Sequence, residues 1–279
     1  MAKKEKEPQY IMSALNTPML NYRVYVMGKV EKILNLLIIF IVSGAIGIVF
    51  YGGLFKDEKG INTKLTYISD LIVFTIVGVI GCTYFMPIRT KQLHDKRKNE
   101  LNVQFKSFLE ALTISLSSGM NMNDSIQSVY KTLKDQYTEK GYIVREVEEM
   151  LAGINNNIPL EEMIMSLGDR SEIEDIRNFA IVFKMSFRTG GNLKDIVRRT
   201  SDIISSKIGI ASEIETALSS NKSQFSIMMI IPVILMIMLK SMSSQFAQSF
   251  TTIPGMIATT VAIGIFFLAY KLGEKIMDI

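Results

Sequence analysis

The chain has 279 residues, of which 48% are hydrophobic and 21% charged, and its formal net charge is only +4. This weak charge excess, with no nucleic-acid-binding motif, argues against a nucleic-acid-binding protein. The single cysteine, Cys82, excludes a disulfide framework within the chain. The hydrophobic content is high for a soluble protein, and its uneven distribution along the chain indicates a membrane protein.

Four apolar segments are predicted to span a membrane, because a bilayer core needs about 20 mainly apolar residues per helix. We place the spans at about 33–55, 67–88, 223–242 and 253–271. The third apolar run is short, and a buried core helix is the alternative there. Pro232 lies within this span, where we expect a kink because proline removes one backbone hydrogen bond. The kink is either a packing feature or a flexible joint.

Lys and Arg predict the orientation of the spans, because cytoplasmic flanks carry an excess of them. We expect the N-terminus, the central block and the C-terminus to lie in the cytoplasm. The apolar run begins only at Ile33, after a polar arm, which predicts an uncleaved anchor rather than a signal peptide. The basic residues that precede the first span or follow the second are Lys3, Lys4, Lys6, Arg23, Lys29, Lys32, Arg89, Lys91, Lys96, Arg97 and Lys98.

The predicted organisation has four parts. They are an N-terminal cytoplasmic arm over 1–31, a membrane hairpin over 32–88, a cytoplasmic helical domain over 89–222 and a second membrane hairpin over 223–279.

Apolar residues in the central block recur at helical spacing, so we predict helices throughout it. No useful stretch alternates with a period of two, so no sheet is expected there. The predicted fold class is all-α, with an antiparallel helical bundle in the cytoplasm. Ser171 and Glu174 have the spacing of a capping box, which predicts a helix beginning there. The first apolar stripe comprises Leu101, Phe105, Phe108, Leu112 and Leu116.

A Gly-x-Asn-x-x-Asp pattern occurs twice in the central block, with its glycines 71 positions apart. Each copy predicts a tight corner: glycine adopts the left-handed conformation that ends one helix, asparagine caps the next, and aspartate supports its first turn. A weaker third corner has Asn157 in the left-handed place and Pro159 opening a helix. The residues of the two copies are Gly119, Asn121 and Asp124, and Gly190, Gly191, Asn192 and Asp195.

Charged residues cluster on faces near these corners, which makes the corners candidate contact sites for a partner. Arg198 and Arg199 are the cationic candidates, together with Lys194. The alternative is that the corners only fold the chain and that the charges form solvated faces. The acidic clusters that we expect to be exposed comprise Glu146, Glu148, Glu149, Glu161 and Glu162.

At these corners the sequence resembles the type II secretion system F-domain family, the inner-membrane platform proteins of secretion systems and type IV pili. The resemblance rests on residues 116–126, 158–164 and 188–196, and it covers roughly 105–239. One such domain between two pairs of spans resembles the platform proteins of tight-adherence (Tad/Flp) pili, which occur as two paralogues. Arg188 and Thr189 stand where many two-domain members have Gly-Glu, so a role tied to that glutamate is not carried over.

The resemblance implies a non-enzymatic platform that couples a hexameric cytoplasmic secretion ATPase to pilin assembly. It also implies contacts with pilin subunits, with a paralogous platform protein and with the lipid bilayer, in a homo- or hetero-oligomer. A transporter or permease subunit is the alternative, but it would need charged residues lining the spans, and these are scarce. A membrane enzyme is disfavoured because no phosphate loop occurs and His94 is the only histidine. We therefore predict no catalytic, cofactor-binding or metal-binding residue.

Overall fold

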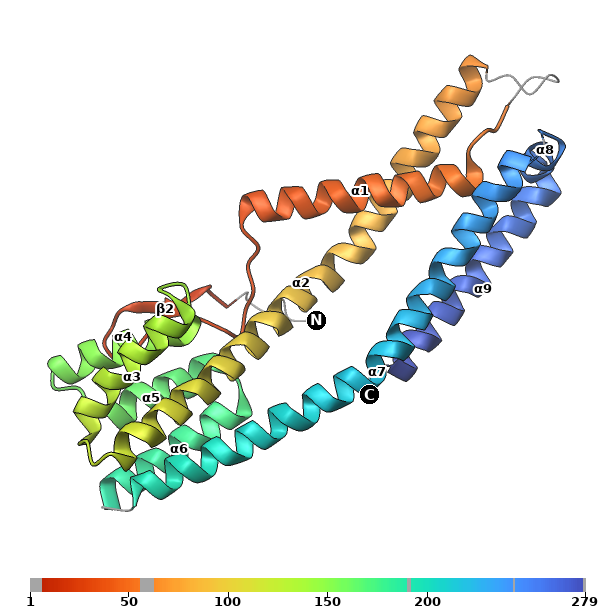
Figure 1. Ribbon diagram of the computed structural model, residues 1–279. Helices are drawn as coiled ribbons and strands as arrows, with labels where there is room; N and C mark the ends of the chain where they lie inside the picture. Colours follow the sequence, from red (N-terminus) through yellow and green to blue (C-terminus); the bar gives the residue numbers. More distant parts are fainter. Residues whose placement is uncertain (1–6, 56–62, 190–191, 243, 278–279) are drawn as a thin grey trace, which may run out of the picture. The chain divides into compact units, whose positions relative to one another are not determined.

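The computed structural model describes residues 7–55, 63–189, 192–242 and 244–277 (Figure 1). Most of this part of the chain is helical, as the periodicity predicted. The chain divides into two compact units: the first contains Met1–Val26 and Thr90–Ser212, and the second contains Met27–Arg89 and Glu213–Ile279. Two long helices, α2 (Lys64–Ser117) and α7 (Leu193–Met242), contribute residues to both units.

The second unit contains helices long and apolar enough to cross a membrane. They are α1 (Lys29–Tyr51), the apolar part of α2, the apolar part of α7, and α9 (Ile253–Met277). A short helix, α8 (Ser244–Thr251), precedes α9. Many large apolar side chains of this unit are exposed, which suits contact with lipid rather than water. Examples are Ile33, Leu71, Ile227 and Ile265.

Helix α1 is shorter at its C-terminal end than the span placed at 33–55. The backbone N–H of Gly52 still donates to the carbonyl of Ile48, but Gly52 itself is extended, with φ −71° and ψ 152°. Two consecutive glycines, Gly52 and Gly53, oppose continuation of the helix because glycine loses the most backbone freedom on folding.

Helices α1 and α2 pack closely in the second unit because each places a phenylalanine over a glycine of the other. A Cβ atom on Gly44 would lie 2.6 Å from the ring of Phe74, and one on Gly78 would lie 2.6 Å from the ring of Phe40. The two rings meet edge to face, with centroids 5.3 Å apart. These small residues are the ones that permit close approach of membrane helices.

Charged side chains from other helices bind the backbone at the end of α1. Lys240 Nζ donates to the carbonyls of Phe50 and Gly52, at 3.1 and 3.2 Å. The N–H of Gly53 donates to Asp70 Oδ1 at 2.9 Å. Lysine here supplies donors to helix-end carbonyls that lack intrahelical partners. Lys240 therefore joins α7 to α1.

Pro232 lies inside α7, and the helix continues through it. Proline lacks the N–H that the fourth preceding carbonyl would accept, so a kink at this residue remains a prediction. Pro87, which was not singled out from the sequence, lies inside α2 in the same way.

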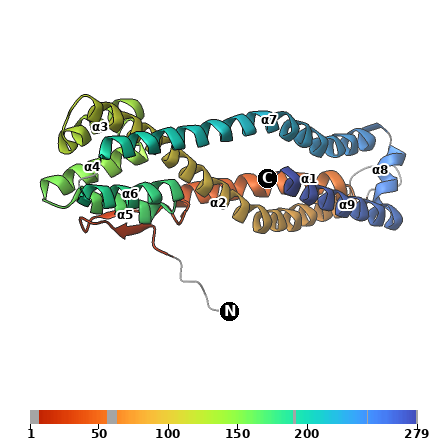
Figure 2. The ribbon, with the colours of Figure 1, turned by 90° about the horizontal axis from the view of Figure 1, so that it is seen from below.

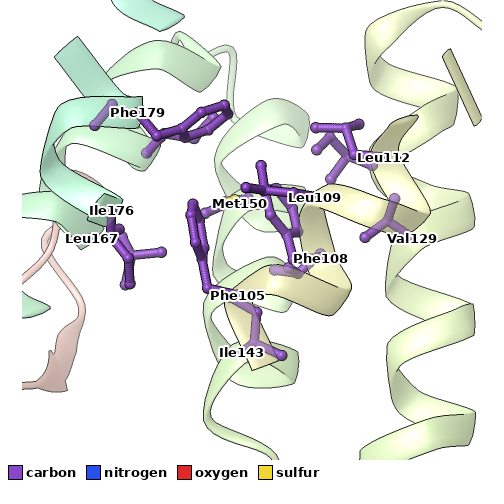
Figure 3. Close-up of a cluster of buried hydrophobic side chains, with 14 of the residues drawn as sticks. Phe105, Phe108, Leu109, Leu112, Val129, Ile143, Met150, Leu167, Ile176 and Phe179 are labelled. Carbon is purple, nitrogen blue, oxygen red and sulfur yellow. The ribbon is translucent and has the colours of Figure 1, made fainter. Parts of the chain in front are cut away.

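The first unit is built around the apolar stripe of α2. Phe105, Phe108 and Leu112 are fully buried, and Phe105 meets Phe179 edge to face with centroids 5.6 Å apart (Figure 3). Buried aromatic side chains remove large areas from water and dominate the stability of such a core. The helices around this stripe are α3 (Met122–Tyr137), α4 (Tyr142–Asn155), α5 (Leu160–Ser171) and α6 (Glu174–Thr189).

The capping box predicted at Ser171 and Glu174 is not present. Ser171 is the last residue of α5, and its hydroxyl donates to the carbonyl of Gly168 at 3.1 Å. Glu172 then adopts a left-handed conformation with φ 52°, and α6 begins at Glu174. The chain therefore makes a sharp turn at the place where the pattern predicted a first helical turn.

The N-terminal arm contains a short hairpin, which was not predicted from the sequence. Strand β1 (Tyr10–Met12) pairs antiparallel with β2 (Pro18–Leu20), and Tyr10 lies opposite Leu20. Tyr22 follows the hairpin and is only 1% exposed in the core of the first unit. Strands of three residues are too short to give a clear alternating pattern.

A buried ion pair joins the arm to α4 and α5. Arg170 donates to both carboxylate oxygens of Glu146, at 2.9 and 2.6 Å, and Tyr22 Oη donates to Glu146 at 3.0 Å. Arg170 also donates to the carbonyl of Leu20 at 3.1 Å. Burial raises the pKa of Tyr22 well above its usual range, and the charge of Glu146 adds to this effect. The phenol therefore remains a donor.

The prediction of exposed acidic clusters is wrong at Glu146 and Glu161, which are buried, and at Glu149, which is half-buried. Glu146 is 2% exposed and Glu161 is 6% exposed. Periodicity places Glu146 beside the apolar Val147 and Met150, but only the fold supplies Arg170 as its partner. Buried charges of this kind are tolerated because they are paired and hydrogen-bonded.

We predict that Arg170→Met destabilises the first unit by about 3–5 kcal/mol, because it leaves the Glu146 carboxylate buried without its partner. Adding Glu146→Met should recover part of this loss. Thermal unfolding of the detergent-solubilised chain, followed by circular dichroism, measures both effects. Glu148→Met is the control, since Glu148 lies on the same helix but is exposed. Equal melting temperatures for wild type and Arg170→Met would contradict the prediction.

Candidate functional site

The first corner connects α2 to α3 through a left-handed glycine. Gly119 has φ +85°, and its N–H donates to the carbonyl of Leu116 at 3.2 Å. The N–H of Met120 donates to the carbonyl of Ser115 at 3.3 Å. These two bonds form a Schellman motif, which satisfies carbonyls that the helix end leaves without partners.

Helix α3 begins directly after this glycine with a cap made by two side chains. Asn121 is the N-cap, and its Oδ1 accepts from the N–H of Asp124 at 2.9 Å. The amide of Asn121 donates back to Asp124 Oδ2 at 2.7 Å. The carboxylate thus orients the capping amide and also places negative charge at the positive end of the helix dipole.

The second corner connects α6 to α7 and has the same cap. Asn192 Oδ1 accepts from the N–H of Asp195 at 3.4 Å, and the Asn192 amide donates to Asp195 Oδ2 at 2.5 Å. The backbone N–H of Ile196 donates to the carbonyl of Asn192 at 3.3 Å. The predicted glycines of this corner, Gly190 and Gly191, lie outside the described residues.

The third corner connects α4 to α5 and uses asparagine where the first uses glycine. Asn157 has φ 57°, its N–H donates to the carbonyl of Ile154 at 3.1 Å, and the N–H of Ile158 donates to the carbonyl of Gly153 at 2.9 Å. This is again a Schellman motif. Pro159 occupies the N-cap position and α5 begins at Leu160, one residue later than a helix opened by Pro159 itself.

The candidate contact residues at these corners are exposed to solvent. On α7, Arg198 and Arg199 are exposed, whereas Val197 beside them is buried in the core. An ion pair of 3.8 Å between Arg188 and Glu161 joins the end of α6 to the first turn of α5, and so links the second corner to the third. The exposed residues of the corners are Gly119, Asn121, Asp124, Pro159, Asn192 and Asp195.

The polar residues that hold the arm were not predicted from the sequence. Arg23 donates to the carbonyl of Asp169 at 3.0 and 2.7 Å, and the ring Nε2 of His94 lies 2.9 Å from the carbonyl of Tyr22. Arg97 stacks over the ring of Tyr25, 4.2 Å from its centroid. The partners of these residues are distant in sequence or are backbone atoms, so no local spacing could have revealed them.

We predict opposite effects for alanine at two glycines that both have open space where a side chain would begin. Nothing lies within 4 Å of a Cβ atom at Gly119 or at Gly209, but Gly119 has φ +85° while Gly209 lies within α7. Gly119→Ala should cost about 1–2 kcal/mol, because an L side chain disfavours the left-handed region. Gly209→Ala should stabilise its helix by roughly 0.5–1 kcal/mol. Thermal unfolding of the solubilised variants tests both signs, and a stabilised Gly119→Ala would contradict the assignment.

The comparisons with known proteins concern the segment that contains all three corners. Residues 108–239 match the model of the family described as "Type II secretion system (T2SS), protein F". Searches of curated proteins and of solved structures found no match. The matched segment begins in the buried stripe of α2 and ends within the apolar part of α7. Over residues 108–239 the chain is therefore similar to the type II secretion system protein F family.

Proposed function

We propose that this chain is an integral membrane platform protein of a tight-adherence-like pilus or type II secretion machine, which couples a cytoplasmic secretion ATPase to pilin assembly. The observation that carries the proposal is the family match over 108–239. Proteins with this domain are typically structural inner-membrane platforms of secretion and pilus systems rather than enzymes. The four apolar helices fit such a multi-pass membrane protein.

In this proposal the first unit is a cytoplasmic antiparallel bundle, and both termini lie in the cytoplasm. Two observations support this arrangement. The C-terminal ends of α2, α4 and α6 lie at the same end of the first unit in both views (Figures 1 and 2). Basic residues such as Arg89 and Lys91 directly follow the second apolar run, which favours the cytoplasmic side.

The three corners would form the surface that meets the ATPase. Tight, capped turns hold their side chains in fixed positions, which lowers the entropy lost on binding. Arg198 and Arg199 would pair with carboxylates of the partner, and arginine is well suited to bidentate recognition of that group. Because α7 is continuous from Leu193 to Met242, it carries both the arginines and an apolar span. The helix would thus pass on a displacement produced at the corner.

The apolar helices of the second unit would contact pilin helices and neighbouring platform subunits. Large apolar side chains remain exposed on every one of them, and lipid offers no driving force that favours helix contact over lipid contact. Association would therefore depend on close packing of small residues. A second copy of the chain or a paralogous platform protein would complete the assembly.

We predict that the double change Arg198→Glu and Arg199→Glu weakens capture of the cognate ATPase by at least about tenfold, because like charges then face each other at the contact. Pulldown of the ATPase by the full chain in detergent measures this loss. The matched control is Lys131→Glu with Lys140→Glu, two exposed lysines on α3 and in the turn after it. Equal capture by both double variants would remove the corner from the proposed interface.

We predict that the first unit is protected from reagents outside the cell. In a Cys82→Ser background, a cysteine at the exposed Met120 beside the first corner should react with a membrane-impermeant maleimide only after the cells are permeabilised. A cysteine at Lys64, the exposed first residue of α2, should react in intact cells. The reverse labelling pattern would overturn the proposed orientation.

A further inference from the structure

One face of α7 is exposed over the stretch that leads into its apolar span. Helix α7 runs without interruption from Leu193 to Met242 (Figure 1). On the exposed face, residues follow one another at alternating intervals of four and three. Ile210, Ile214 and Met228 on this face are 58%, 52% and 64% exposed. We call this face the outer stripe, and its members are Ile210, Ile214, Ala217, Asn221, Gln224 and Met228, all of them exposed.

The outer stripe lies on a different side of α7 from the residues that pack within the chain. In the first unit, Val197 and Ile204 of α7 are buried in the core. In the second unit, Phe225 stacks on Tyr270 of α9 with ring centroids 5.9 Å apart, and Met236 is buried. Since each residue turns a helix by about 100°, these inward residues lie roughly 60–140° around α7 from the stripe. Packing within the chain therefore leaves the stripe exposed.

The alternating spacing of the stripe is that of a seam between two helices. In such a heptad repeat the a and d positions recur on one side, and a helix with the same repeat packs its side chains between them. Every second member of the stripe, beginning with Ile210, takes a d position, and the others take a positions. The preceding a position is Lys207, whose ammonium group pairs with Asp175 of α6 at 2.5 Å. A seam between identical helices would therefore begin after Lys207, where two lysines would otherwise meet.

Two amides inside the stripe identify a second copy of this chain as the partner. Asn221 takes an a position, and Gln224 takes the next d position, directly before the apolar run of α7. Neither side chain forms a hydrogen bond among the residues that the structure describes. A side-chain amide holds both a donor and an acceptor, so it can bond to the identical amide of a second copy. An asparagine at an a position also fixes the register of such a pair.

The membrane and the flanking charges favour the same partner. Because α7 continues into an apolar span, two copies in one bilayer have parallel α7 helices, with equal positions at equal depth. In a parallel pair, each g residue beside the seam meets the e residue five positions later in the partner. Between 210 and 228 the single charged residue at these positions is Glu213, which comes opposite Leu218 of the partner subunit. No like charges meet along the seam.

The size of the seam indicates where it would be stable. The same spacing continues past Met228 to Met242, which gives about 48 Å of helix, about 10 Å wide, or roughly 500 Å² per copy. A stable interface between soluble proteins buries about 800 Å² per partner. Anchoring both copies in one bilayer lowers the freedom that they lose on association, so a smaller contact suffices there. The pairing is therefore expected in membranes rather than in detergent.

We propose that the outer stripe of α7 pairs with the same stripe of a second copy of this chain, in a parallel seam with hydrogen bonds between the Asn221 amides and between the Gln224 amides. The inference rests on the proposed function only in that it requires the chain to lie in a membrane. It does not require an ATPase, because the stripe and the three corners use different residues. Loss of the pairing would therefore leave capture of the ATPase unchanged.

Cysteine cross-linking in membranes tests which face of α7 forms the contact. In a Cys82→Ser background, single cysteines along the helix are oxidised with copper phenanthroline. The cross-linked dimer should be at least about fivefold more abundant for Ile214→Cys and Ala217→Cys than for Ser219→Cys on the opposite side, because only equal positions on the seam come within disulfide reach. No excess at the stripe positions, or a maximum at Ser219→Cys, would overturn the proposal.

The amide contact has its own matched pair of variants. Asn221→Asp keeps the shape of the side chain but sets two carboxylates opposite each other, so it should lower the cross-link yield of Ala217→Cys by at least about tenfold. Ser219→Asp adds the same charge on the opposite side and should leave the yield within about twofold of the parent. Circular dichroism confirms that both variants are folded.

Equal yields from Asn221→Asp and Ser219→Asp would overturn the proposal. A cross-link to a co-expressed platform paralogue that replaces the one between identical copies would assign the stripe to that protein and would equally overturn it.

Discussion

The Glu146 and Arg170 charges are both buried, and each must keep its hydrogen bonds because an unpaired buried charge is very costly. Glu146 lies on α4, Arg170 lies on α5, and the remaining bonds of the pair go to Tyr22 and to the carbonyl of Leu20 in the arm. The pair therefore fixes three segments at once. The hairpin, the C-terminal part of α5 and the end of the arm all take their positions from this one interaction.

The corners follow a second constraint, which is local. A helix leaves its last carbonyls without partners, and a left-handed residue returns two N–H groups to them; Gly119 and Asn157 both do this. The helix that follows needs an acceptor for its first N–H groups, and Asn121 and Asn192 supply it. Because every partner lies within a few residues, each corner forms with little dependence on the rest of the core.

The corner contacts join residues close in sequence, whereas the contacts of the ion pair join distant residues. This difference explains which features could be predicted from the sequence. The apolar stripe of α2 and the capping residues depend on spacing within one or two turns, and the apolar runs depend only on composition, so these features could be predicted. The arm could not, because Tyr22, His94 and Arg170 find their partners across the fold. Glu146 looked like a solvated residue for the same reason. Ser171 shows a further limit. Its hydroxyl donates to the carbonyl of Gly168 in α5, and the spacing of a capping box does not say whether a serine ends one helix or begins the next.

The paired contacts of Phe40 with Gly78 and of Phe74 with Gly44 give the first membrane hairpin a single register. Sliding α1 along α2 would move each ring off the glycine that accommodates it. Rotation of either helix about its own axis would likewise move the phenylalanine rings away from the glycines. The two segments therefore interlock, and the apolar part of α2 and α1 are expected to move together as one rigid body.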